Sequence, residues 1–187
     1  AFASIGGKDL PSSNVLHEGP AVRLGADNHF IGSHVLVPRR GLALHINAFN
    51  FPIWGMLEKF APSFLAGMPC IVKPASATSF VAEAAVRLIV ESGLLPEGAL
   101  QLVIGGTGDL FERLEEADVV TFTGSADTAL MLKASLNLLR RCIPFNAEAV
   151  SLNCAILAPD VQPGDPEFEL FVKEVAREMT VKAGQKC

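Results

Sequence analysis

The sequence has no excess of basic residues and no long apolar run. Its 187 residues include 15 Lys and Arg against 20 Asp and Glu, which gives a formal net charge of −5. This balance argues against nucleic acid or an anionic membrane as a partner, because both attract a basic surface. A membrane-spanning helix needs roughly 18 or more consecutive apolar residues, and the sequence contains no such run. We therefore expect neither a nucleic-acid nor a membrane partner.

Cysteine is also scarce and its motifs are missing. The four cysteines, at positions 70, 142, 154 and 187, form no CxxC pair and no Cys/His arrangement of the zinc type. This pattern favours reduced thiols in a cytoplasmic protein without a metal site. The first residues, AFASIGGKDL, lack the basic region and apolar core of a signal peptide, so we expect no leader.

The sequence does contain many short apolar segments at regular spacing. Half of the residues are hydrophobic and 19% are charged, which suits one large domain with a sizeable core. Residues 1–34 are mixed polar with several turn signals, and predict a lead-in segment that allows a hairpin. From about residue 35, runs typical of strands alternate with stretches of helical periodicity. We expect strands over 42–46, 70–73, 119–124, 142–147 and 153–158, and a strand followed by a turn over 100–106. We expect helices over 54–67 (kinked or stepped at Pro62), 77–93, 108–117, 125–140 and 166–184.

This alternation predicts an α/β fold with a doubly wound parallel sheet, because parallel strands need crossover connections of helical length. Ligands bind such sheets outside the carboxyl ends of the strands. The segments expected at those ends are Asn47–Phe51, Lys73–Ser76, Gly105–Thr107, Thr123–Ser125 and Glu148.

Three of these strand ends carry candidate nucleotide contacts. In FTGS (122–125), Gly124 ends a strand and Ser125 begins a helix, whose free N–H groups and positive dipole suit a phosphate. The same serine fits an ordinary helix cap. Gly105 lies in IGGTG, which resembles part of a phosphate loop but lacks the full GxGxxG and fits a plain turn. Lys73 is either a solvated charge or a group that reaches a cofactor's sugar.

Three further residues carry candidate chemistry. Asn50, between a buried strand and a helix, either offers its amide to a developing oxyanion or is an ordinary helix cap or turn residue. Glu148 is either bonded by backbone N–H groups or poised as a general base. Cys187 follows Ala-Gly-Gln-Lys after a long helix, and is either an inert thiol or a thiolate nucleophile.

The order of these residues resembles the aldehyde dehydrogenase superfamily. The resemblance rests on NFP (50–52), KP (73–74), FTGS (122–125), Glu148 about 24 residues later and Gly-Gln-Lys-Cys (184–187), and it covers roughly residues 35–187. The segments HINAFNFPIWGMLEKFAP and FELFVKEVAREMTVKAGQKC are similar in sequence to one branch of this superfamily. The enzymes of that branch oxidise CoA-linked semialdehydes with NADP in phenylacetate and benzoyl-CoA degradation. Many relatives carry ELGGKSP after the glutamate, whereas this chain has EAVSLN (148–153).

The resemblance implies a Rossmann-like cofactor-binding domain over residues 35–187 that ends at the nucleophile, with the family's catalytic and oligomerisation domains absent. It implies a full-length homo-oligomer that oxidises a CoA-linked aldehyde with NADP, and a fragment that is inactive alone. The implied catalytic residues are Cys187, Glu148 and Asn50. The implied cofactor-binding residues are Ile46, Asn47, Ala48, Phe49, Lys73, Ser76, Gly105, Gly124, Ser125 and Thr128.

The choice of NADP over NAD rests on Ser76. Relatives that prefer NAD often carry a glutamate three residues after the matching lysine, and its carboxylate repels a 2′-phosphate. Ser76 is small and neutral, leaves room for that phosphate and can donate a hydrogen bond to it, with Lys73 supplying positive charge nearby. The alternative function is a non-catalytic cofactor-binding or interaction module with the same fold.

Overall fold

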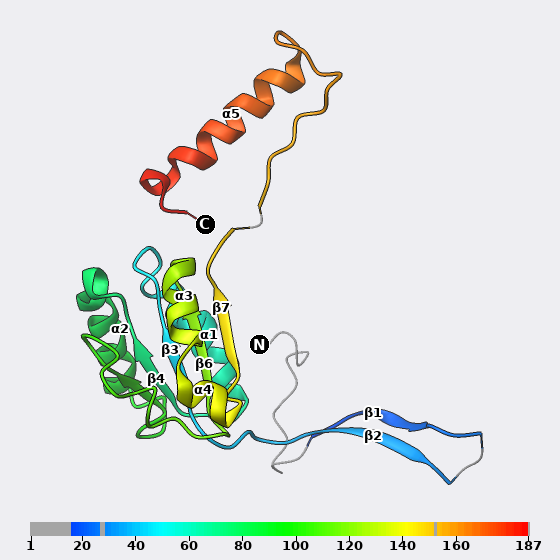
Figure 1. Ribbon diagram of the computed structural model, residues 1–187, viewed down its shortest axis with the longest axis vertical. Coiled ribbons are helices and arrows are strands. Elements are labelled where there is room, and N and C mark those ends of the chain that lie inside the picture. The colour runs from blue at the N-terminus through cyan, green and yellow to red at the C-terminus, as the bar shows by residue number, and fades with distance from the viewer. Residues whose placement is uncertain (1–15, 27–28, 152, 187) are drawn as a thin grey trace.

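The centre of the protein is a five-stranded sheet in which every neighbouring pair of strands is parallel. We describe a computed structural model that covers residues 16–26, 29–151 and 153–186 (Figure 1). The strands are β3 (Ala43–Ile46), β4 (Cys70–Lys73), β5 (Leu100–Leu102), β6 (Val119–Thr123) and β7 (Phe145–Glu148), in the order β5-β4-β3-β6-β7. This topology confirms the predicted doubly wound α/β fold.

Helices cover both faces of the sheet. On one face, α1 (Trp54–Leu65) and α2 (Ser79–Glu91) pack against Ala43, Cys70, Val72 and Leu100 through Met56, Phe60 and Val86. On the other face, α3 (Ala126–Lys133) and α4 (Leu136–Arg141) pack against Leu44, Ile46, Val120 and Phe122 through Ala129, Leu132 and Leu138. Alternate residues of β3 thus face opposite layers, which explains why this central strand is a continuous apolar run apart from His45.

The strand register aligns the carboxyl ends of the strands, where the candidate site residues lie. Ile46 pairs with Lys73 on one side and with Phe122 on the other, and Thr123 pairs with Glu148. The carboxyl ends of β3, β4, β6 and β7 therefore lie side by side, as parallel pairing requires.

The opposite edge is fixed by Asp118. Its buried carboxylate accepts hydrogen bonds from the N–H groups of Leu42 (2.8 Å) and Glu115 (2.7 Å), just before β3 and β6 begin. Gly41 passes close to this carboxylate with φ +86°, and a Cβ at this position would lie 2.5 Å from the carbonyl oxygen of Ala117. Glycine is required here for both conformation and space.

Two parts of the chain extend away from the sheet (Figure 1). Strands β1 (Leu16–Arg23) and β2 (Ile31–Leu36) form an antiparallel hairpin. Helix α5 (Pro166–Thr180) has no buried residue and is followed by a 3-10 segment, Val181–Gly184. Among the helices that the structure describes, none combines the length and apolarity of a membrane span.

Four predicted elements are wrong or misplaced. The region 108–117 is a series of turns rather than a helix, because the Asn137 side chain donates to the carbonyls of Phe111 and Leu114, both at 2.8 Å. The predicted helix 125–140 divides into α3 and α4 at residues 134–135. The predicted strand 153–158 is extended but pairs with no strand among the described residues. The predicted helix 166–184 is α-helical only as far as Thr180, because Lys182 and Ala183 are left-handed. Helix α1 runs through Pro62 and ends at Leu65, two residues before the predicted end at Gly67.

Candidate active site

Two cavities meet at the carboxyl ends of β3, β6 and β7. The smaller cavity has a volume of about 300 Å³. The residues that line it and not the larger one are Phe51, Trp54, Gly55, Glu58, Lys59 and Lys186. The larger, about 800 Å³, extends toward Lys73, Ala75, Gly124, Ser125 and Thr128. Asn47, Ala48, Asn50, Thr123 and Glu148 line both cavities. Two predicted catalytic residues, Asn50 and Glu148, thus belong to the wall that the cavities share, and further predicted nucleotide contacts line the larger cavity beside it.

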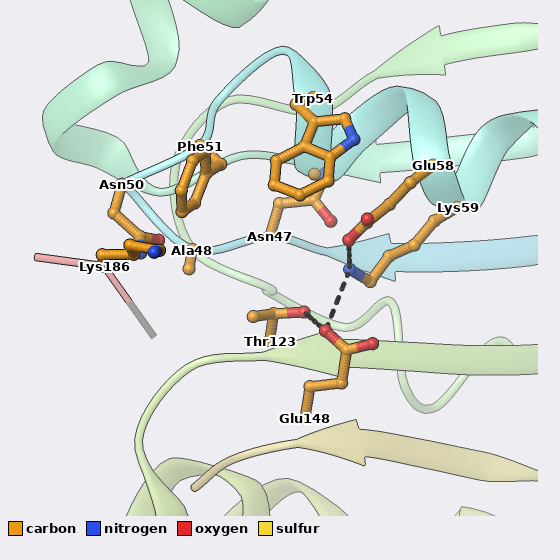
Figure 2. Close-up of a pocket in the computed structure, with 11 residues that line it drawn as sticks. Asn47, Ala48, Asn50, Phe51, Trp54, Glu58, Lys59, Thr123, Glu148 and Lys186 are labelled. Atoms are coloured by element: carbon orange, nitrogen blue, oxygen red, sulfur yellow. Dashed lines mark hydrogen bonds and ion pairs between the residues drawn. The ribbon is translucent and has the colours of Figure 1, made fainter. Parts of the chain in front are cut away.

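The smaller cavity holds a cation between two carboxylates (Figure 2). The Lys59 side chain is only 9% exposed, and its Nζ lies 3.5 Å from Glu58 Oε1 and 3.8 Å from Glu148 Oε2. The Thr123 hydroxyl donates to the same Glu148 oxygen at 3.3 Å. Attraction between charges strengthens as solvent is excluded, so Lys59 and Thr123 hold the Glu148 carboxylate at the mouth of this cavity.

Glu148 is less enclosed than its apolar sequence neighbours suggest. Its side chain is 60% exposed in the described part of the chain. The position at the end of β7 leaves the carboxylate open to water on one side while Thr123 and Lys59 bind the other. Such a carboxylate is oriented and yet accessible to water, which suits a general base that activates a water molecule.

Asn50 joins the cavity to the C-terminal segment. Its side-chain N–H donates to the carbonyl of Gln185 at 2.6 Å, and Lys182 Nζ lies 3.8 Å from the centre of the Phe51 ring. Cys187 lies outside the described residues, so its role stays a prediction. The two residues before it, Gln185 and Lys186, both lie at the cavity, one bonded to Asn50 and the other in the lining.

The larger cavity has the features of an anion cradle. The Ser125 hydroxyl accepts from the N–H of Thr128 at 3.3 Å and thereby caps α3. A Cβ on Gly124 would lie 2.5 Å from the ring of Phe122, so a residue with a side chain does not fit at this position just before the helix. Ser125 is therefore a helix cap, and the helix start that it forms opens directly into the cavity.

Two predicted cofactor-binding residues do not line either cavity. Ser76 is exposed in the 3-10 turn Ser76–Thr78, one residue beyond Ala75, which lines the larger cavity. Gly105 lies in the loop after β5 with φ +117°, and a Cβ there would meet no atom within 4 Å. The remaining eight, Ile46, Asn47, Ala48, Phe49, Lys73, Gly124, Ser125 and Thr128, all line the larger cavity.

Two side chains of the smaller cavity were not among the sequence candidates. Glu58 and Lys59 are the only charged residues of α1, whose sequence is WGMLEKFAPSFL. Two adjacent residues of opposite charge in an otherwise apolar helix are the sequence feature that marks them as candidates. The contact between Lys59 and Glu148 joins segments far apart in the sequence, so it is not visible in the local pattern.

Two buried groups of the sheet, His45 and Cys70, are unsuited to proton transfer or nucleophilic attack at neutral pH. Burial, and then the charge of Lys59, lowers the pKa of His45 to about 4, so its ring is neutral and bonds Ser63 Oγ at 3.1 Å. Burial raises the pKa of the Cys70 thiol to about 11. A thiol that stays protonated is a poor nucleophile.

The orphaned amide of Asn47 tests whether a ligand fits the common wall. Asn47 is 5% exposed, and neither its amide nitrogen nor its amide oxygen has a partner among the described residues. Buried polar groups without partners are rare in folded proteins. A cavity with this amide, Lys73 and a capped helix start offers donors, an acceptor and positive charge, which fits a nicotinamide dinucleotide.

The chain is similar in sequence to known aldehyde dehydrogenases. Residues 18–187 match the aldehyde dehydrogenase family. The chain is 52% identical over 181 residues to 3,4-dehydroadipyl-CoA semialdehyde dehydrogenase of Aromatoleum evansii, covering 97% of this chain and 35% of that protein. It is 30% identical to D-glyceraldehyde dehydrogenase (NADP(+)) of Picrophilus torridus, covering 79% of this chain and 29% of that one.

Solved structures give the same fold. Succinic semialdehyde dehydrogenase from Streptococcus pyogenes, in complex with NADP+, superposes with a TM-score of 0.70 at 20% identity, over 90% of this chain and 35% of that one. The chain spans about a third of the length of the relatives it matches.

Proposed function

We propose, from the premise that this chain belongs to the aldehyde dehydrogenase family, that the complete protein oxidises a CoA-linked semialdehyde to the carboxylate with NADP. The observation that carries the proposal is the convergence of Glu148, Asn50 and the segment before Cys187 on one cavity, next to a second cavity lined by Lys73 and Ser125.

The substrate class is proposed from the relative that shares 52% of its residues with this chain and is named for a CoA-linked semialdehyde. Because this chain covers only 35% of that protein, the binding site for the CoA portion is a proposal about the complete protein. A homo-oligomeric, cytoplasmic enzyme is part of the same proposal.

The proposed chemistry uses three residues of this chain. The Cys187 thiolate adds to the aldehyde carbon, and the Asn50 amide with the Cys187 backbone N–H binds the resulting oxyanion. Loss of one such donor raises the barrier by about 2.7–4 kcal/mol. Bound NADP supplies the acceptor for the hydride that leaves this adduct as the thioester forms. Glu148 then removes a proton from water, which attacks the thioester and releases the acid and the thiolate.

Asn50 has a second part in this scheme. Its side-chain N–H already bonds the Gln185 carbonyl at 2.6 Å, two residues before the nucleophile. The same amide therefore holds the segment that positions Cys187, and the proposed oxyanion contact is made beside that anchor.

NADP is proposed through Lys73 and Ser76. Lys73 lines the larger cavity and its Nζ donates to the Pro74 carbonyl at 3.1 Å. Ser76 lies one residue beyond the lining residue Ala75, at the position where a carboxylate would repel a 2′-phosphate. Relief of this repulsion together with a charge-assisted bond gives NADP a preference of roughly ten- to hundredfold.

The test assays the complete protein on a CoA-linked semialdehyde with NADP and with NAD. We expect turnover with NADP, loss of turnover in Cys187→Ala with cofactor affinity retained, and normal turnover in the matched control Cys154→Ala, which removes an exposed thiol. Ser76→Glu should shift kcat/KM strongly toward NAD. Dinucleotide binding without any aldehyde oxidation would instead favour a cofactor-binding module, and a wild type that prefers NAD would refute the assignment of Ser76.

A further inference from the structure

Asn47 is the unpartnered polar side chain that faces both cavities. It directly follows β3, and its backbone N–H donates to the Lys73 carbonyl at 3.0 Å. Its amide nitrogen and oxygen, the His45 Nδ1 and the Thr121 hydroxyl are buried without partners among the described residues. Of these three residues only Asn47 lines a cavity. Figure 2 shows it in the wall of the smaller cavity, below Trp54.

The place of this amide restricts the ligand that it meets. Glu148 and Asn50, where the aldehyde is proposed to react, belong with Asn47 to the wall that lines both cavities, whereas Lys73 and Ser125, where the phosphates and adenosine are proposed to bind, line the larger cavity alone. The redox-active half of a dinucleotide has to reach the aldehyde from the larger cavity. It therefore has to lie against the wall that the two cavities share, and Asn47 is the buried residue of that wall.

We propose that the Asn47 amide positions the nicotinamide riboside half of the cofactor. This inference rests on the proposed function and adds a residue that distinguishes the two halves of the dinucleotide. A primary amide has a donor and an acceptor side by side, which matches the carboxamide of the nicotinamide ring and the vicinal hydroxyls of its ribose. In this proposal the adenosine half, with its 2′-phosphate, does not contact Asn47.

The amide also couples cofactor binding to stability. Without ligand, a buried donor and a buried acceptor lack partners, which destabilises the cofactor-free protein. With ligand, both are satisfied, and the gain appears as affinity. An apolar side chain of similar size should reverse both effects, since it neither loses nor gains a hydrogen bond.

The experiment compares Asn47→Leu with the control Thr121→Val in the complete protein. Both changes replace an unpartnered buried polar group by an apolar one of similar shape, but Thr121 lines neither cavity. Binding is measured by calorimetry with NADPH, which contains both halves, and with 2′,5′-ADP, which contains only the adenosine half. Thermal unfolding of the ligand-free proteins is measured in parallel.

We expect Asn47→Leu to weaken NADPH binding by roughly 10- to 100-fold, as loss of one or two hydrogen bonds predicts. Binding of 2′,5′-ADP should stay unchanged, and the ligand-free variant should unfold at a higher temperature than wild type. Thr121→Val should bind both ligands as wild type does.

Three results would overturn the assignment. Unchanged NADPH affinity in Asn47→Leu would show that the amide does not contact the cofactor. Equal weakening of NADPH and 2′,5′-ADP would indicate a general distortion of the site. A lower unfolding temperature of ligand-free Asn47→Leu would mean that another part of the complete protein already pairs with the amide. Failure of wild type to bind either ligand would refute the proposed function itself and is distinguishable from all three.

Discussion

The buried His45 makes the stability of the protein depend on pH in a direction that the structure specifies. His45 is 0% exposed on β3, and burial, followed by the nearby charge of Lys59, lowers the pKa of its imidazole from 6.5 to about 4. The ring accepts or donates one hydrogen bond with Ser63, and its Nδ1 has no partner in the described chain. Replacement by leucine removes the titrating group from this position.

The magnitude follows from the shift in pKa. A lowering from 6.5 to about 4 corresponds to about 3 kcal/mol, at about 1.4 kcal/mol per pKa unit. The unfolded chain takes up a proton on this residue as the pH falls through 6.5, whereas the native protein does not until about pH 4. The unfolded state binds more protons in this window, so the contribution to stability is complete above 6.5 and is lost progressively as the pH falls toward 4.

The assay is urea unfolding of wild type and His45→Leu between about pH 7.5 and pH 4.5. Every other titrating group is shared, so the difference between the two free energies of unfolding isolates His45. We expect this difference to move by about 2–3 kcal/mol in favour of the variant as the pH falls. Ser63 still donates to the Lys59 carbonyl at 3.0 Å in the variant, so no new unpaired hydroxyl obscures the result. A difference that does not change with pH would refute the reasoning.

Three further predictions concern the site and its support. Glu148→Gln should give a rapid burst of NADPH and then slow turnover, because the thioester forms but is not hydrolysed; pre-steady-state absorbance checks this, and equal loss of burst and steady state would make Glu148 structural. Asn50→Ala should lower kcat by about 10²–10³-fold, and an unchanged kcat would leave Asn50 as a turn residue. Asp118→Ala should lower the free energy of unfolding by about 2–5 kcal/mol, since it removes the buried carboxylate that accepts from two part-buried N–H groups; a urea midpoint close to that of wild type would contradict the role of this carboxylate.

The elements that sequence periodicity predicted well are those whose pattern is set by the sheet itself. The run around β3 is apolar because both faces of that strand are covered, and α1 and α2 show their apolar stripe because each packs on one face. The turns at 108–117 were not predictable from local pattern. The Asn137 side chain, more than 20 residues later, binds the carbonyls of that segment, and this contact is made only in the folded chain.

The site divides in the same way. Asn50, Lys73, Ser125 and Glu148 were predicted together because strand ends of a parallel sheet share an edge, and all four line the larger cavity. The contact between Asn50 and Gln185, 135 positions apart, follows from tertiary structure alone. The pairing of Lys59 with Glu148, 89 positions later, likewise follows only from the tertiary structure, which brings this end of α1 to the end of β7.

The central claim is that Cys187 carries the substrate as a thioester that Glu148 hydrolyses. The most direct measurement is mass spectrometry of the complete Glu148→Gln protein after it has reacted with NADP and a CoA-linked semialdehyde. The account predicts an acyl group of the substrate's mass on the peptide that contains Cys187, in an amount equal to the NADPH burst. A burst without an adduct, or an adduct on the exposed Cys154 while Cys187→Ala still turns over, would contradict it.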